Sequence, residues 1–151
     1  IIFGPGSLYT SIIPNLLVSH VVDTIKKSNA HKIYICNIMT QPGETTGHTV
    51  SDHIKALIQH SGCPNLIDVV IVNDRHPQRL LEKYKEKGQE PVLIDAEEIQ
   101  KLGVRVVARN LIIEEDLVRH DPKLLSRALM LWYKRWQKYP VKKIDSGKVA
   151  L

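Results

Sequence analysis

The chain has 151 residues, of which 43% are hydrophobic and 25% charged, a balance typical of a soluble globular protein rather than a disordered one. Its apolar runs are far shorter than the ~20 residues of a transmembrane helix, and no signal segment opens it, so we expect a cytoplasmic protein. Cys36 and Cys63 form no C-x-x-C pair. A disulfide framework is therefore not expected.

The net charge of +5 is unevenly distributed along the chain. Residues 132–151 contain six basic side chains and one acidic one, which accounts for the whole excess. Binding to nucleic acid is not expected, because it requires a broad basic face. We predict one domain over residues 1–139 and a basic tail over residues 140–151. An alternative is an interaction module whose basic tail docks an acidic partner or a membrane surface.

The opening stretch, residues 1–18, reads I-I-F-G-P-G-S-L-Y-T-S-I-I-P-N-L-L-V. The pattern predicts a buried strand, a Gly-rich turn and a helix that is broken near Pro14. The backbone N–H groups of such a turn form a nest that suits a phosphate. The alternatives are a plain tight connection, with Ser7 as a helix N-cap and Tyr9 covering the sheet. The candidate phosphate contacts are Gly4, Pro5, Gly6, Ser7, Tyr9 and Ser11.

The second stretch, residues 32–54, predicts a strand over 32–37, a long polar loop over 37–49 and then a helix. This loop exceeds the usual length of such a connection, and long loops are often functional. Thr49 and Asp52 predict a capping box, and Gly62 ends the helix. His48 and His53 lack the spacing of a metal-binding pair and are expected to face solvent, so no metal site is predicted. The candidate sugar or base contacts are Asn37, Met39, Thr40, Gln41, Glu44 and Thr45.

The segments G-P-G-S-L-Y-T-S-I-I-P-N-L-L and Y-I-C-N-I-M-T-Q-P-G-E-T-T-G-H-T-V-S-D-H-I resemble the gluconeogenesis factor family, which is related to the CofD-like 2-phospho-L-lactate transferases. The R-H-D of residues 119–121 looks like a third family element. The resemblance implies a Rossmann-like α/β protein that binds a nucleotide sugar such as UDP-N-acetylglucosamine in a pocket lined by the 37–49 loop. It also implies a role in cell shape during growth on gluconeogenic carbon sources. Family members are about twice as long and have a G-G-G-T-G-type turn absent here, so we interpret the chain as the C-terminal half.

The remaining pattern alternates strands with helices, which predicts a three-layer αβα fold with a mostly parallel sheet. Pro77 is expected at the start of a helix, and Asp121 is expected to cap the last helix. That last helix should turn one apolar stripe inward: Leu125, Leu129, Trp132 and Trp136. The expected elements are strands over 66–72, 91–94, 104–108 and 110–113 and helices over 77–88, 95–102 and 122 onward.

In a parallel sheet, ligands bind beyond the carboxyl ends of the strands, so the two polar loops should converge there. Arg119 and His120 could hold a diphosphate, or Arg119 could pair with Glu115 or Asp116 at a helix entrance. No catalytic triad or Walker loop is present, which favours binding over turnover. The alternative is a 2-phospho-L-lactate transferase-like enzyme whose divalent metal would be bound by residues outside this chain. The chain could also assemble as a homo-oligomer.

Overall fold

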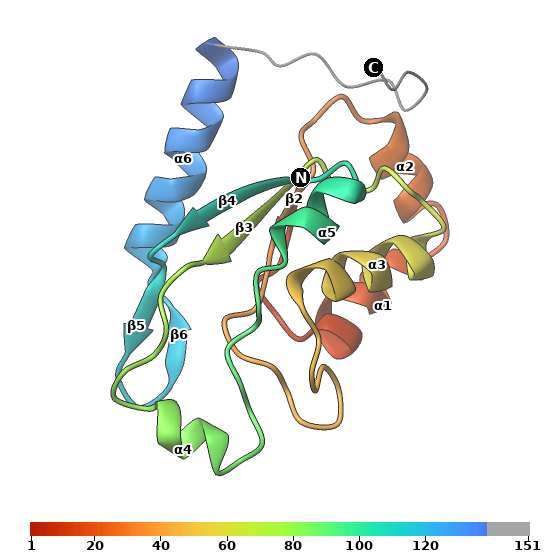
Figure 1. Cartoon of the computed structure of the whole chain (residues 1–151). Coiled ribbons are helices and arrows are strands. Elements are labelled where there is room, and N and C mark those ends of the chain that lie inside the picture. Colours follow the sequence, from red (N-terminus) through yellow and green to blue (C-terminus); the bar gives the residue numbers. More distant parts are fainter. Residues whose placement is uncertain (139–151) are drawn as a thin grey trace.

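The computed structural model describes residues 1–138 (Figure 1). The main sheet has the order β1-β2-β3-β4, and every neighbouring pair is parallel. Its central strand β3 has four buried residues among five. The predicted α/β class with a parallel sheet is confirmed. The strands of this sheet are β1 (Ile2–Phe3), β2 (Ile33–Ile35), β3 (Val69–Asn73) and β4 (Arg105–Arg109).

Helices cover both faces of the sheet and give three layers (Figure 1). On one face, Phe3, Tyr34 and Val70 pack against the buried residues of four helices, α1 (Ile13–Leu16), α2 (Val21–Lys27), α3 (Val50–Ser61) and α5 (Ala96–Lys101). On the other face, Ile33 and Ile71 pack against α6 (Pro122–Lys138). The predicted inward stripe of this helix is confirmed, because Leu125, Leu129 and Trp132 lie against that cluster and the ring of Trp136 meets that of His31 edge to face.

The chain reaches α1 through a single wide turn, η1 (Leu8–Ile12). The N–H groups of Ser11 and Ile12 both donate to the carbonyl of Ser7, at 3.0 Å each. Pro14 then lies in the first turn of α1, where its missing N–H costs no helical hydrogen bond. η1 passes into α1 at Ile13 without a gap, so the helical path changes from a wide to an ordinary turn just before Pro14 and is not broken there as predicted.

The helix expected over 77–88 is much shorter in the structure. The segment α4 covers only Leu81–Lys85, and the expected start at Pro77 is wrong. The main-chain N–H groups of Gln78, Arg79 and Leu80 donate to the Glu114 carboxylate at 2.8 to 2.9 Å. This carboxylate holds the segment before α4 as a loop, and Gly88 follows the helix at a φ of 69°.

The strand expected over 91–94 is also wrong. Pro91 makes one isolated antiparallel bridge with Met39, and the Val92 N–H donates to the Ile38 carbonyl. The backbone groups near Pro91 are thus used by the loop after β2 and not by the sheet. Leu93 is 66% exposed, so this segment runs over the surface.

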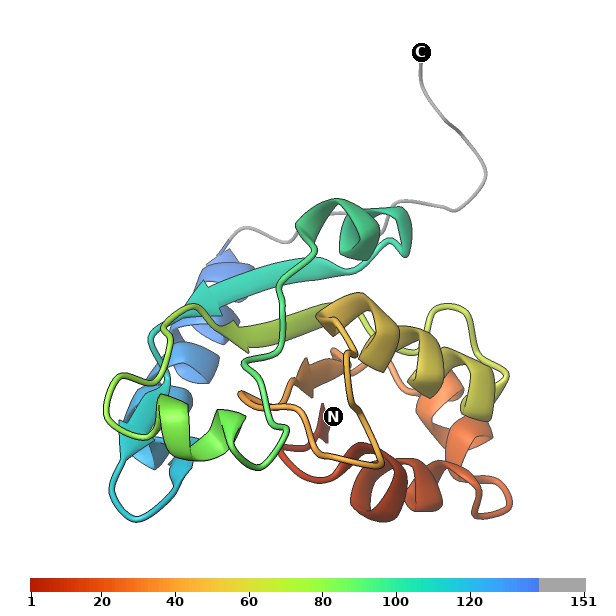
Figure 2. The ribbon, with the colours of Figure 1, turned by 60° about the horizontal axis from the view of Figure 1, so that its bottom comes forward.

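Arg119 and His120 lie in a separate antiparallel hairpin of β5 (Ile112–Glu114) and β6 (Val118–His120), which is near α4 in Figures 1 and 2. Asp121 accepts from the N–H groups of Lys123 and Leu124, which confirms the predicted N-cap of α6. Within residues 1–138, no helix is long and apolar enough to cross a membrane. The predicted tail over 140–151 lies outside the described residues.

Candidate functional site

The opening turn requires glycine at position 4 and not at position 6. Gly4 has a φ of 83° and precedes a cis Gly4–Pro5 bond. A Cβ on Gly4 would lie 2.9 Å from the Ile35 carbonyl oxygen, whereas one on Gly6 would meet Ser11 Cβ at an ordinary 3.5 Å. The turn therefore packs its backbone directly against the end of β2, where only glycine fits.

The donors of this turn hold a carboxylate from the second loop. Ser7 Oγ donates to both oxygens of Glu44 at 2.7 Å, and the Tyr9 N–H donates to Glu44 Oε1 at 2.9 Å. Thr10 Oγ1 donates in turn to Ser7 Oγ at 2.7 Å. Ser7 stands directly before η1, but its hydroxyl accepts no main-chain N–H of that turn, so the side-chain N-cap alternative is wrong. The two candidate loops converge at Glu44, as the parallel topology predicts.

Several residues of the 37–49 loop are used to hold its shape. Thr40 and Thr45 are buried, and their hydroxyls accept from the N–H groups of Glu90 and Gln41, respectively, at 2.9 Å. Met39 packs in a small cluster with Ile38 and Tyr84. Asn37 and Gln41 are half-buried, and their side-chain amides lie 3.5 Å apart. Asn37 and Gln41, together with Glu44, are therefore the polar residues of the predicted set with accessible surface at this edge.

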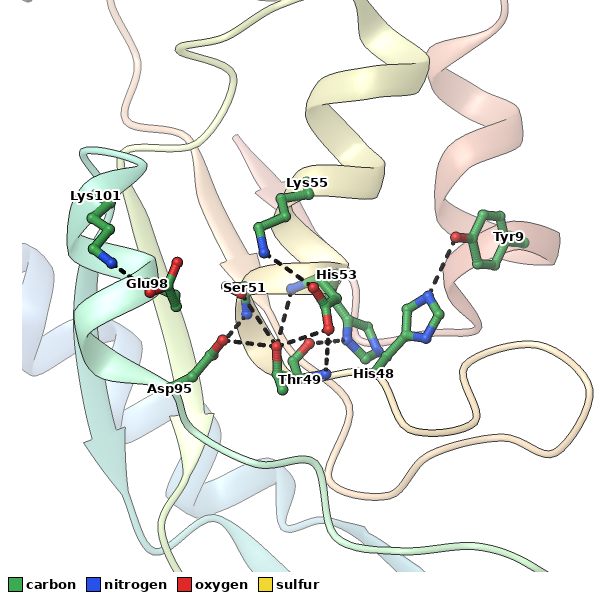
Figure 3. A network of polar contacts seen from close by, with 10 residues as sticks. Tyr9, His48, Thr49, Ser51, His53, Lys55, Asp95, Glu98 and Lys101 are labelled. Atoms are coloured by element: carbon green, nitrogen blue, oxygen red, sulfur yellow. Dashed lines mark hydrogen bonds and ion pairs between the residues drawn. The ribbon is translucent and has the colours of Figure 1, made fainter.

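A row of polar side chains continues from this loop across the start of α3 (Figure 3). Asp95 accepts from Thr49 Oγ1 at 2.8 Å and from the Ser51 N–H at 2.9 Å. The predicted capping box of Thr49 and Asp52 is confirmed. Burial acts to raise the pKa of the Asp95 carboxyl, but the bonds from Ser51 and Thr49 outweigh it and lower the pKa. Asp95 directly precedes α5 but makes no side-chain cap bond to it, and its carboxylate instead ties the start of α3 to this segment.

His53 is fully buried, which corrects the expectation that it faces solvent. Its Nδ1 lies 2.8 Å from the Thr49 carbonyl oxygen, so Nδ1 carries the proton of that bond. Nε2 is buried and has no hydrogen-bond partner among the described residues. Burial lowers the pKa of His53, and the bond to Thr49 opposes this only in part. The spacing from Val50 and Leu57 on the apolar face of α3 was the sequence signal for this burial.

Aromatic rings connect His53 to the opening turn. The ring of His48 meets that of His53 edge to face at 5.7 Å, and Tyr9 Oη lies 3.5 Å from His48 Nε2 (Figure 3). Tyr9 also packs edge to face on His60 at 5.7 Å. Tyr9 thus packs against His48 and against α3, whereas the packing alternative placed it over the sheet.

The two residues expected at a diphosphate are placed differently. Arg119 is exposed and lies opposite Ile113 in the hairpin. His120 is half-buried next to the backbone of Cys36, directly after β2. Burial lowers the pKa of His120, and its contact with the Cys36 backbone opposes this shift. His120 therefore lies at the carboxyl edge with the two loops. In the described part of the chain, no three His, Cys, Asp or Glu residues form a metal-sized group.

Comparison with known proteins shows which family the chain resembles in sequence. Residues 1–112 match the family described as 2-phospho-L-lactate transferase CofD. A Bacillus subtilis protein named gluconeogenesis factor is 45% identical over 132 residues, which are 86% of this chain and 41% of that protein. A gluconeogenesis factor of Halalkalibacterium halodurans is 40% identical over 131 residues, or 86% of this chain and 41% of that protein.

Solved structures agree with this result. A crystal structure of a Bacillus halodurans protein, described as a member of the UPF0052 family, superposes with a TM-score of 0.82 at 41% identity. The match covers 86% of this chain and 42% of that chain. This chain thus spans about two fifths of the relatives' length, and its assignment to their C-terminal half stays a prediction. The chain belongs to the CofD family and is a homologue of the gluconeogenesis factors.

Proposed function

We propose that this chain supplies the phosphate- and sugar-binding edge of a nucleotide-sugar-binding protein, with UDP-N-acetylglucosamine as the expected ligand type. The observation that carries the proposal is the Glu44 carboxylate held by Ser7 Oγ and the Tyr9 N–H. Distances of 2.7 to 2.9 Å are those of charge-assisted bonds, so these donors already bind an anion. A ligand phosphate would use the same donors after Glu44 moves away.

The other candidate residues are assigned by their positions at this edge. Asn37 and Gln41 offer amide donors and acceptors for the sugar or the base, because they keep accessible surface next to Glu44. His120 lies near the end of β2, within the same region, and Arg119 would approach a diphosphate from the exposed side of β6. Mixed amide, hydroxyl and cationic groups are what a nucleotide sugar requires.

The cellular role that we propose is supported by the family resemblance alone. A UDP-sugar binder related to the gluconeogenesis factors is proposed to act in the cytoplasm and to connect growth on gluconeogenic carbon with cell shape. A homo-oligomer is also proposed, and light scattering of the purified chain tests it.

A second function is a group transfer, favoured by the match of residues 1–112 to 2-phospho-L-lactate transferase CofD. Such an enzyme would move a phosphate-bearing group from a nucleotide donor to a hydroxyl acceptor with the help of a divalent metal. Product formed from a nucleotide donor only in the presence of Mg²⁺ would support it. Unchanged ligand after prolonged incubation supports binding without turnover.

Calorimetry with UDP-N-acetylglucosamine tests the binding proposal. Ser7→Ala should weaken binding by roughly 1.5 to 3 kcal/mol, because the variant loses one hydroxyl that meets a charged oxygen. Ser126→Ala is the matched control, since Ser126 is exposed on α6 and its hydroxyl donates to the Lys123 carbonyl within the same helix. Equal affinities of the wild type and Ser7→Ala would remove the turn from the site.

A further inference from the structure

A small pocket lies at the amino ends of the strands, on the edge opposite the candidate site. Lys32 directly precedes β2, and Leu66 lies shortly before β3. The pocket has a volume of about 240 Å³. It is lined mainly by Lys26 and Lys32, by Asn65, and by the less polar Ile25, Cys63 and Leu66. We call it the Lys32 pocket.

Lys32 is an unusual lysine, because it is only 4% exposed. Its ammonium has three N–H donors, and one of them is used by the Ser28 carbonyl oxygen at 3.0 Å. Among the described residues no carboxylate lies within 4.0 Å of Lys32 Nζ. A charge this deeply buried is normally paired, so Lys32 has donors left for an anion.

The neighbouring carboxylate is engaged elsewhere. Asp68 Oδ2 accepts from the main-chain N–H of Lys32 at 2.9 Å and lies 3.9 Å from His31 Nδ1. Lys26, from the last turn of α2, adds a second positive charge to the pocket lining. No acidic side chain is part of that lining within the described residues. Two like charges at one small pocket repel each other, and an anion between them relieves this repulsion.

A purely structural role for Lys32 explains less. A lysine near the carboxyl end of a helix such as α2 satisfies the last carbonyls and the helix dipole. The bond to Ser28 fits this role, but it uses only one of the three ammonium donors. It also does not explain why Lys26 and Asn65 line an open pocket beside Lys32.

We propose that the Lys32 pocket binds a small phosphate-type oxyanion, separately from the nucleotide-sugar site. The volume of about 240 Å³ is below the roughly 300 to 1,000 Å³ of pockets for drug-sized ligands. It therefore suits free phosphate or a short phosphate monoester better than a whole nucleotide. Lys32 and Lys26 supply the charge, and the Asn65 side-chain amide supplies a neutral donor.

Amide NMR of the 151-residue chain, titrated with inorganic phosphate and separately with glycerol 3-phosphate against chloride of equal ionic strength, locates the site. Saturable shifts at Lys32, Cys63 and Asn65 with either ligand are expected. If neither ligand moves these amides, the proposal is overturned. Shifts at Ser7 and Tyr9 alone would overturn it too, while supporting the site at the opposite edge.

Lys32→Met keeps the straight side chain and removes the ammonium, so the ligand dissociation constant should rise about tenfold or more. Lys27→Met is the matched control, because Lys27 is exposed on α2, next to Lys26, and does not line the pocket. Equal binding by Lys32→Met and the wild type would contradict the proposal. If Lys32→Met does not fold, the titration of the wild type still decides.

Discussion

Ser7 and Glu44, 37 residues apart, form the contact that joins the two polar loops: Ser7 Oγ lies 2.7 Å from each carboxylate oxygen. The carboxylate also accepts the Tyr9 N–H near the start of η1, where the positive end of a helical turn favours an anion. This contact shows which donors of the opening turn point toward an anion. Under the proposed function, a phosphate that uses these donors would have to displace the Glu44 side chain.

Glu44→Gln tests this displacement. The amide weakens the bond from Ser7 and removes a negative charge near the ligand, so nucleotide-sugar affinity should rise by about 1 kcal/mol, or roughly fivefold. Calorimetry measures the change, and Glu97→Gln, at an exposed position of α5, serves as the control. A fall in affinity would mean that Glu44 itself contacts the ligand, which contradicts displacement.

Gly4→Ala should destabilise the fold by about 2 to 3 kcal/mol, because a left-handed backbone and a short contact with the Ile35 carbonyl oxygen coincide there. Gly6→Ala should change the free energy of unfolding by less than about 1 kcal/mol. Urea unfolding of both variants compares the two glycines. Similar losses at both positions would contradict the assignment of the strict requirement to Gly4.

Thr49 and Asp95 should be energetically coupled. Thr49→Ala should cost about 1 to 2 kcal/mol, since it removes the hydroxyl of the capping box. Asp95→Ala leaves the Ser51 N–H without its acceptor and should cost a similar amount. In a double-mutant cycle, the loss of unfolding free energy in the double variant should differ from the sum of the two single losses by at least about 0.5 kcal/mol. Strict additivity would show that the contact contributes nothing to stability.

Stability should decrease as the pH falls below neutrality. The folded-state pKa values of His53 and His120 lie below the usual 6.5, mainly because of burial. The unfolded chain therefore binds more protons in this range, and its protonation favours unfolding. The contribution of the neutral His53 and His120 to the free energy of unfolding is fully present above about pH 6.5. It is lost as the pH falls toward and through the lowered folded-state pKa values.

His53→Gln should reduce the slope of unfolding free energy against pH between pH 8 and 5, as measured by urea midpoints. His76→Gln, at an exposed position, is the control and should keep the slope. A slope that is unchanged in His53→Gln would contradict the protonation state assigned to His53.

Local patterns predicted the parts of the fold whose causes are local. Thr49 and Asp52 are three residues apart, and Asp121 caps the helix that follows at once, so both caps could be read from neighbouring residues. The apolar spacing of α6 similarly identified its inward face.

The errors arise where a distant residue determines the local structure. Glu114 binds the N–H groups before α4 from more than 30 residues away, and the 38–40 segment pairs with residues 90–92. No pattern near Ser7 identifies Glu44 as its partner. His53 is different, because its place between Val50 and Leu57 on an apolar face did indicate burial.

The amide resonance of Tyr9, followed by NMR during titration with UDP-N-acetylglucosamine, tests the central claim most directly. The Tyr9 N–H now donates to Glu44 at 2.9 Å, and a ligand phosphate is expected to replace that acceptor. We predict a saturable shift of the Tyr9 amide over the same ligand concentrations at which calorimetry detects binding. We also predict that Ser7→Ala binds the ligand more weakly than the wild type. Binding that leaves the Tyr9 amide unmoved, or no binding at millimolar ligand, would contradict it.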